Sequence, residues 1–406
     1  MNLLLQKSYL LLVILGVCAL SSLQAQPGLA SACFEENGNF VSQIDGRPCV
    51  NTVISAVPFL RITPDARSAA MGDAGVALSP DANALAQNAS RLAFAEEDLA
   101  LSATYTPWLQ ALGLNDVYLA YLSGYKRLDE FQTLGASLRY FSLGDIQFTD
   151  ENAQPVGVGK PNEFEVALAY SRRLSDRFGA SLTAKYVHSD LAAGQEVGGT
   201  ILEVGRAFAA DIGFTYRNDD IRTAGGANNK FAIGLAITNI GSKISYSRDT
   251  IRDFLPANFS LGTAYTFELD QYNTITLTGQ VDKLLVPTPC LGEDCDAEAR
   301  RDQSPIAAII SSWGDAPSGF EEELREFTFS VGAEYWYDQQ FAVRAGYFHE
   351  DRSKGGRRYL TAGLGLKYNI FGLNFSYLVP TSNQRNPLDN TLRFSILFDF
   401  SDTEGT

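Results

Sequence analysis

Between residues 99 and 400 the chain alternates apolar residues with small, polar or charged ones. In the segment 178–186, Phe178, Leu182 and Tyr186 share one face, and the other face is small or polar. The same alternation recurs in two later segments, 360–368 and 392–400. A period of two is the side-chain period of a β-strand, so this part of the chain is predicted to form strands with one apolar face.

About fourteen such strands are predicted, and most are about 9 to 11 residues long, the length that crosses a bilayer when tilted. Strands of soluble sandwiches are commonly about 5 to 6 residues. The predicted strands lie near 99–107, 114–124, 132–142, 163–173, 177–189, 205–217, 230–240, 257–268, 272–284, 325–337, 340–350, 358–369, 372–381 and 390–400. An even number of long alternating strands predicts an all-β fold, a 14-stranded antiparallel transmembrane β-barrel.

The connections between the predicted strands alternate in length. Short links such as "SDR" and "DQ" alternate with long ones, of which residues 285–324 are the longest. Short periplasmic turns opposite long extracellular loops are usual in outer-membrane barrels. Residues 218–229 break the alternation, because they are long where a short turn is expected.

The N-terminus reads as a secretory signal peptide. Lys7 precedes the apolar run 9–20, and small residues lead to a cleavage site before Gln26. The run is shorter than the roughly 20 apolar residues of a spanning helix, and no later segment reaches that length. The expected organisation is a signal peptide (1–25), a variable N-terminal segment (26–56), a plug or hatch segment (57–98), an outer-membrane barrel (99–400) and a C-terminal tail (401–406).

Export agrees with the use of cysteine. After removal of the leader, four cysteines remain in two local pairs, Cys33 with Cys49 and Cys290 with Cys295, which are predicted to form disulfides in an oxidising compartment. The spacing in "CLGEDC" and the presence of two histidines leave too few soft ligands for a metal site. We therefore expect neither a metal nor a cofactor.

The acidic balance excludes one class of function. The formal net charge is −15 and the isoelectric point is about 4.7. No basic stripe is present that could displace the counterions of a phosphate backbone, which argues against a nucleic-acid partner. A secreted or envelope protein fits this composition.

The stretch "RITPDARSAAMGDAG", residues 61–75, has helix-start chemistry before the first strand. Thr63 is the expected N-cap of a helix over 64–71, with Pro64 as its first residue, and Gly72 is expected to end it. An irregular strand-like stretch should follow. A barrel of this size is too wide for its own side chains to fill, so the segment is predicted to enter the lumen as a plug, the alternative being a solvated periplasmic tail. The predicted plug residues are Arg61, Thr63, Pro64, Asp65, Arg67, Met71, Gly72, Asp73 and Gly75.

Residues 58–94, "PFLRITPDARSAAMGDAGVALSPDANALAQNASRLAF", resemble the N-terminal signature of the PorV family of type IX secretion outer-membrane proteins, within the wider FadL-like barrels. The resemblance is specific at "FLRITPDARS" and at "MGDAGVA" followed by "SPDAN". The family usually has an Asn-Pro-Ala motif before the first barrel strand. Here Asn88, Ala89 and Ser90 replace it, so no proline fixes the turn at this position.

The resemblance implies a role without enzymatic activity in the bacterial outer membrane. PorV-like proteins receive secreted cargo bearing a C-terminal signal domain from the large translocon pore of the system. They shuttle it to a cell-surface sortase complex, which attaches the cargo to lipopolysaccharide. The partners implied are the cargo, the pore, the sortase and the outer-membrane lipid.

The long loop 285–324 is the candidate partner-binding loop. It contains the apolar stretch "IAAIISSW", and an apolar stretch in an aqueous loop suggests a contact with a protein or a lipid. The alternative is that the loop folds back over the barrel mouth. Trp108, at the first hairpin, is expected in the interfacial aromatic belt. The candidate contact residues are Ile306, Ile309, Ile310, Trp313 and Phe320.

Three other functions compete with the shuttle. A FadL-type transporter of long-chain fatty acids or other hydrophobic molecules predicts an apolar pocket beside the plug. A diffusion porin predicts an unplugged lumen. A lipid hydrolase would need His188, Ser189 and Asp190, but consecutive strand residues point to opposite faces, so the first two cannot form a base and nucleophile pair.

Overall fold

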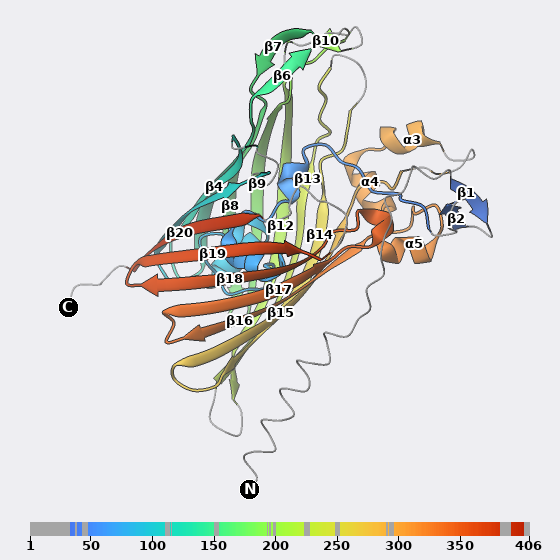
Figure 1. The fold of residues 1–406 in the computed structure, drawn as a ribbon. Coiled ribbons are helices and arrows are strands. Elements are labelled where there is room, and N and C mark those ends of the chain that lie inside the picture. The colour runs from blue at the N-terminus through green and yellow to red at the C-terminus, as the bar shows by residue number, and fades with distance from the viewer. Residues whose placement is uncertain are drawn as a thin grey trace.

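The chain forms one closed barrel of fourteen antiparallel strands (Figure 1). The computed structural model describes residues 33–36, 39–42 and 48–401, except 110–113, 115, 150–153, 193, 195, 198–199, 223–227, 248–251, 290, 292–295 and 382–390. The predicted signal peptide and residues 402–406 lie outside them. Every predicted strand is present, and the fold class is confirmed. Starting from β3, the chain passes round the wall and closes where β20 pairs with β3.

The barrel strands differ from their predicted bounds by a few residues at most ends. They are β3 (Leu99–Pro107), β4 (Val117–Arg127), β5 (Gln132–Leu143), β8 (Asn162–Ser175), β9 (Phe178–Asp190), β12 (Gly205–Arg222), β13 (Asn228–Gly241), β14 (Asn258–Glu268), β15 (Asn273–Leu284), β16 (Phe327–Tyr337), β17 (Phe341–His349), β18 (Arg358–Tyr368), β19 (Phe371–Pro380) and β20 (Leu392–Phe400).

Besides the barrel strands, the described residues form three small hairpins and several short helices. The hairpins are β1 (Cys33–Glu36) with β2 (Asn39–Ser42), β6 (Ile146–Thr149) with β7 (Pro155–Gly159), and β10 (Glu196–Val197) with β11 (Thr200–Ile201). The helices are η1 (Pro58–Arg61), α2 (Ala66–Ala70), η2 (Ala84–Ala86), η3 (Ala89–Phe94), α3 (Ala297–Asp302), α4 (Pro305–Ser311), α5 (Phe320–Arg325) and η5 (Arg352–Lys354). None of the helices in the described residues is long and apolar enough to span a bilayer.

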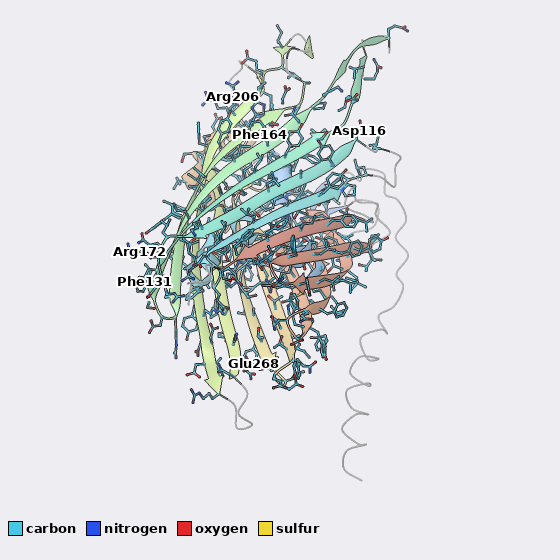
Figure 2. All side chains as sticks on the ribbon, turned by 90° about the vertical axis from the view of Figure 1, so that its left-hand side faces the viewer. Asp116, Phe131, Phe164, Arg172, Arg206 and Glu268 are labelled. Atoms are coloured by element: carbon cyan, nitrogen blue, oxygen red, sulfur yellow. The ribbon has the colours of Figure 1, made fainter. Side chains whose placement is uncertain are left out.

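The outer face of the wall is an apolar band between two charged ends. Leu168, Leu182 and Phe208 are 59 to 69% exposed, and each lies between buried neighbours in the same strand. Figure 2 shows Asp116 and Arg206 toward one end of the wall, with Arg172 and Glu268 toward the other. An apolar band flanked by polar ends is the outer surface of a membrane barrel, so the outward face of these strands contacts lipid.

The one connection that broke the predicted alternation is mostly strand. β12 continues to Arg222, which pairs with Asn228 of β13, so the two strands extend well past the expected turn. The expectation of a long turn over 218–229 was therefore wrong. The sequence there lacks apolar alternation because the extension projects beyond the lipid-facing band, where both faces of the strands can be polar.

Residues 57–95, which we call the lumen segment, lie inside the barrel (Figure 1). Several wall glycines let its backbone approach the wall directly. A Cβ added at Gly346 would lie 2.1 Å from the amide nitrogen of Gly72, and one added at Gly234 would lie 2.1 Å from the carbonyl oxygen of Val76. Because backbone cannot yield as a flexible side chain can, these positions admit only glycine without movement of the lumen segment.

Substituting Gly346 by alanine should therefore destabilise the barrel. We expect Gly346→Ala to lower the free energy of unfolding by about 1 to 3 kcal/mol, the usual cost of overpacking. The measurement is urea titration followed by heat-modifiable electrophoretic mobility. Gly279→Ala is the matched control, because nothing lies within 4 Å of a Cβ there, and it should change stability by less than about 0.5 kcal/mol. Equal effects of the two substitutions would contradict the close approach.

Candidate functional site

The helix of the lumen segment begins two residues later than the sequence suggested. Asp65, rather than Thr63, is the N-cap, and its carboxylate accepts a hydrogen bond of 2.7 Å from the amide of Ser68. Pro64 is buried and precedes the cap. The prediction of Thr63 as cap was wrong because the aspartate is the better placed acceptor for the N3 amide. The carbonyl of Thr63 instead accepts from Arg393 Nε at 3.1 Å.

The end of the helix follows the prediction, whereas the stretch after it does not. Gly72 has a φ of +70°, the left-handed conformation expected of a residue that ends a helix. Residues 76–78 form a turn and a bend, and none of residues 75–80 belongs to a strand. The physical reason is that the amides of Gly75 and Val76 both donate to the Gln280 side-chain oxygen, at 2.8 and 2.9 Å, and so pair with one point of the wall.

Arg67 joins the lumen segment to the wall through a buried carboxylate. Its Nε and Nη2 donate to the two oxygens of Glu334, at 3.0 and 2.8 Å, and Glu334 also accepts from Arg344 Nε at 2.6 Å. Arg67 Nη1 reaches Asp81 at 3.1 Å, within the lumen segment. Two cations against two carboxylates leave no net charge in this cluster, which limits the cost of desolvation.

Further residues of the predicted plug also contact the wall. Met71 is fully buried and lies where a side chain at Gly332 would stand. Asp73 accepts a hydrogen bond from the hydroxyl of Tyr359 in β18. Arg61, at the end of η1, lies within electrostatic range of Glu350 in the extracellular loop after β17. Met71 and Asp73 thus add to the contacts between the lumen segment and the wall.

Asn88 is a buried residue of this site that sequence reasoning did not assign a role. Its side chain caps η3 by accepting from the amide of Ser90 at 3.2 Å, and it donates to the carbonyl of Val76 at 2.9 Å and to Thr215 at 3.2 Å. The cap forms with alanine at the next position, so the turn does not depend on a proline. The usable signal was an asparagine two residues before a serine, a common start of a helical turn.

One pocket beside the lumen segment is small. A pocket of about 50 Å³ lies between the lumen segment and the strands β12 to β15, lined among others by Phe94, Arg217, Lys230 and Phe231. Sites for ligands of drug size occupy roughly 300 to 1,000 Å³. This pocket therefore does not hold a long-chain fatty acid in the present conformation.

Residues 285–326, which we call the rim subdomain, contain α3, α4 and α5. Figure 1 shows these helices to one side of the barrel. Trp313 packs edge to face on Phe259, with ring centroids 5.2 Å apart, and lies 6.3 Å from Phe327. These two phenylalanines are on the outward face of β14 and β16, because the alternate residues Ser260 and Thr328 are buried. The part of the loop around Trp313 therefore does not fold over the barrel mouth.

Trp108 is buried and does not lie in the lipid-facing aromatic belt where it was expected. It is 6% exposed and packs against Phe141, with ring centroids 5.6 Å apart, in a buried cluster with Phe59 of the lumen segment. The prediction that Trp108 belongs to the lipid-facing belt was wrong. Its backbone amide bonds Val117 across the hairpin, so the strand register and not the apolar character of the side chain decides its face.

The helix α5 buries two of its three glutamates and exposes its apolar residues. Glu322 and Glu323 are 3% and 5% exposed, as is Glu326 at 7% just after the helix, whereas Phe320 is 74% exposed and Leu324 is 51% exposed. Phe320 is one of the predicted contact residues, and Leu324, one turn further on, shares its exposed side but was not among them. Spacing at i and i+4 would have identified it.

Two buried lysines hold α5 in this orientation. Lys283, on the outward face of β15, pairs with Glu326 at 2.6 Å and with Glu323 at 2.7 Å. Lys354, from the extracellular loop after β17, pairs with Glu322 at 2.5 Å and with Glu326 at 3.0 Å. Breaking such a buried pair costs about 3 to 5 kcal/mol. The inverted orientation of α5 is therefore firmly fixed.

The N-terminal segment completes this cluster. The side-chain amide of Asn51 donates to Glu322 at 2.9 Å, and its backbone amide donates to the carbonyl of Ser353 at 2.7 Å. Cys49 is disulfide-bonded. The side chain of Cys33 and the pair Cys290 and Cys295 lie outside the described residues, so both disulfide pairings stay predictions.

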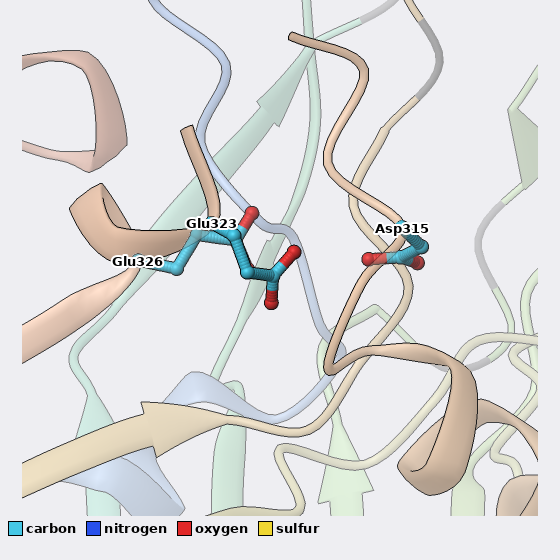
Figure 3. A group of neighbouring side chains, drawn as sticks. All are labelled: Asp315, Glu323 and Glu326. Carbon is cyan, nitrogen blue, oxygen red and sulfur yellow. The ribbon is translucent and has the colours of Figure 1, made fainter. Parts of the chain in front are cut away.

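Three carboxylates of the rim subdomain lie close together. Figure 3 shows Glu323 and Glu326 beside α5 and Asp315 on a neighbouring loop, and their ligand atoms all lie within 4.8 Å of one another. The ammonium of Lys283 contacts two of them, and Thr288 donates to Glu326 at 2.6 Å. A lysine thus supplies the positive charge that this group of acids requires, and nothing here calls for a metal ion.

Ser189 and His188, two residues of the hydrolase hypothesis, point to opposite faces of β9. Ser189 faces the lumen, where it donates to Glu163 at 2.6 Å and accepts from the hydroxyl of Tyr246 at 2.9 Å. His188 stacks on Phe164, with ring centroids 4.5 Å apart, on the other face of β9. The alternation of faces predicted this separation, and no nucleophile and base pair is formed by these two residues.

The buried ion pairs and hydrogen bonds of Glu322, which hold α5 in place, should break at acid pH. Burial alone would raise the pKa of Glu322, but hydrogen bonds from Lys354, from the Ser318 amide and from Asn51 bring it below its ordinary value. A carboxyl whose pKa is lowered on folding contributes stability that is present above its unfolded pKa of about 4.3 and is lost as the pH falls through the folded value. Hydrogen exchange of residues 315–326, corrected for intrinsic rates, should therefore show constant protection from pH 7 to about 5 and a loss below about 4.

The variant Glu322→Gln is the control for this prediction. It keeps the shape of the side chain but cannot titrate, so protection of α5 should be weaker at pH 7 and should depend less on pH. Protection that survives unchanged to pH 3 in the unaltered protein would contradict the role of Glu322.

Comparison with known proteins places the chain in a family. A family model described as type IX secretion system protein PorV matches residues 47–291, more than half of the chain. No curated protein sequence matches. Among solved structures, the toluene transporter TodX of P. putida has a TM-score of 0.46 at 12% identity and covers 82% of this chain and 98% of its own. For the toluene transporter TbuX of Ralstonia pickettii the values are 0.46, 14%, 82% and 97%. For a Pseudomonas aeruginosa FadL homologue they are 0.41, 9%, 86% and 100%.

Likenesses this distant carry no argument about function. The family match, by contrast, spans the lumen segment and the wall from β3 to β15. The chain therefore belongs to the PorV family of type IX secretion system proteins, as an outer-membrane β-barrel.

Proposed function

We propose that this protein is a carrier for secreted proteins on the outer surface of the membrane. It receives cargo bearing a C-terminal signal domain from the translocon pore and delivers it to the cell-surface sortase complex, which attaches the cargo to lipopolysaccharide. The role needs neither an enzymatic centre nor a cofactor. Family membership supports the secretion system as its setting.

The observation that carries the proposal is the inverted orientation of α5. Phe320 and Leu324 face water, although apolar residues at i and i+4 on a helix normally face a core. The buried ion pairs of Lys283 and Lys354 prevent the helix from turning these residues inward. An apolar surface that is held exposed marks an interaction site. We assign Phe320 and Leu324 to the contact with cargo.

The filled lumen supports a carrier over the two channel functions. A diffusion porin needs an open lumen, whereas the lumen segment is tied to the wall by Arg67, Asp73 and Asn88. A transporter of long-chain fatty acids needs a large apolar cavity, whereas the pocket beside the lumen segment measures about 50 Å³. The extracellular surface is then the part of the molecule available for binding.

A pull-down tests the proposed function as a whole. We expect the tagged protein, extracted from its native outer membrane in gentle detergent, to bring down secreted proteins that share a C-terminal signal domain, together with the pore or the sortase. Mass spectrometry identifies what co-purifies. Recovery of the barrel with fatty acid or other lipid alone would overturn the carrier and favour the transporter.

Substitution of the α5 surface tests the site. The double variant Phe320→Ser with Leu324→Ser should reduce cargo recovery by about 30-fold, the equivalent of a hot spot of about 2 kcal/mol. Ile201→Ser is the matched control, because Ile201 is 61% exposed in the extracellular hairpin of β10 and β11, and it should leave recovery unchanged. Unaltered recovery with the double variant would place the cargo contact elsewhere.

A further inference from the structure

The helix α4 turns its apolar residues outward and its small residues toward the protein. Ala308 and Ser312 are fully buried, whereas Ile306 is 59% exposed and Ile310 is 70% exposed. Ile306, Ile310 and Trp313 follow one another at intervals of four and three residues, so they lie along one side of the helix. This exposed apolar side is distinct from the α5 surface that we assign to cargo.

The stretch that forms this side carries no charge at all. Residues 304–314 read "SPIAAIISSWG", whereas α3 before them reads "AEARRD" and α5 after them reads "FEEELR". A helix that faces water normally carries charged residues on its outer side. We therefore expect that the outer side of α4 does not face water.

The position of Trp313 shows what lies next to this side. Trp313 is 45% exposed and packs on Phe259 and Phe327, at the extracellular ends of β14 and β16. The next outward residues along these strands, Leu261 and Phe329, are 42% and 47% exposed and belong to the lipid-facing band. The apolar side of α4 therefore continues the band that contacts lipid.

We propose that α4 and Trp313 form a foot that is inserted in the outer leaflet of the membrane. The occupant of this surface is the lipid of that leaflet, at the depth of the aromatic girdle, where tryptophan is favoured. A short helix with an apolar side lies in the plane of the membrane and inserts about 5 to 10 Å into the boundary between head groups and acyl chains. The foot fixes the height of the rim subdomain above the membrane, and this inference does not depend on the cargo proposal.

Quenching of a fluorescent label tests the foot directly. Ile310→Cys and Phe320→Cys, each labelled with bimane in the full-length mature protein, are compared in nanodiscs of phosphatidylethanolamine and phosphatidylglycerol. A fraction of the lipids carries a nitroxide near the head group. Because the foot lies below the head groups, we expect iodide in solution to quench the label at 310 roughly tenfold less than the label at 320. The nitroxide lipid should quench the label at 310 strongly and the label at 320 weakly.

Equal access of iodide to both labels would overturn the foot. Shielding of position 310 that appears only in native outer membrane, and not in nanodiscs, would assign this side of α4 to a protein partner and would also overturn it. Heat-modifiable mobility verifies that each variant is folded, and Ile306→Cys, on the same side of α4, replaces Ile310→Cys if the latter fails.

A further pair of variants separates this proposal from the cargo contact. Ile306→Gln with Ile310→Gln should leave cargo recovery unchanged, whereas the α5 double variant should leave the quenching at position 310 unchanged. Loss of cargo recovery in the α4 variant would overturn the separation of the two surfaces.

Discussion

The carboxylate of Glu334 is the point on which the interior of the barrel depends. It lies on β16, fully inside the lumen, and accepts hydrogen bonds from Arg67 of the lumen segment and from Arg344 of the neighbouring strand. A buried charge is tolerated only when it is paired and hydrogen-bonded. The lumen segment therefore cannot leave without taking Arg67 away from Glu334, which would leave this buried carboxylate with Arg344 as its one remaining cation. Wall glycines such as Gly346 also contribute, because they let the backbone of the lumen segment pack directly on the backbone of the wall.

The same rule acts outside the barrel with a different result. Lys283 and Lys354 are buried beneath α5 and require the carboxylates that this helix supplies. Once the charged side of the helix is committed to the protein, its apolar side must face outward. Ordinary packing would bury Phe320 and Leu324 and leave the glutamates in water. Electrostatic pairing has thus taken precedence over hydrophobic burial, and an adhesive surface is held in the position where a partner can reach it.

Local patterns in the sequence predicted the wall of the barrel, because a two-residue period and bilayer length act on each strand independently. They also predicted the glycine that ends α2. They failed where distant residues decide the structure. Thr63 was the expected cap, but Asp65 caps α2, and the carbonyl of Thr63 accepts from Arg393, more than three hundred positions away. The chain turns at residues 76–78 because the Gln280 side-chain oxygen accepts from the successive amides of Gly75 and Val76. The inverted orientation of α5 follows from lysines in two other parts of the chain, and no pattern within "FEEELR" reveals it.

Trp108 and Trp313 lie on opposite sides of the barrel wall, the first buried and the second on the outward face. Trp108 follows a barrel strand directly, and it is buried against Phe59 and Phe141 at the mouth of the lumen. Trp313 belongs to the long loop between β15 and β16, and it packs on the outward face of β14 and β16. The loop thus supplies a girdle residue that the wall itself would ordinarily provide. With α4 beside the outward face of the wall and α5 turned by its buried ion pairs, the rim subdomain presents two separate apolar surfaces, Ile306 with Ile310 on α4 and Phe320 with Leu324 on α5.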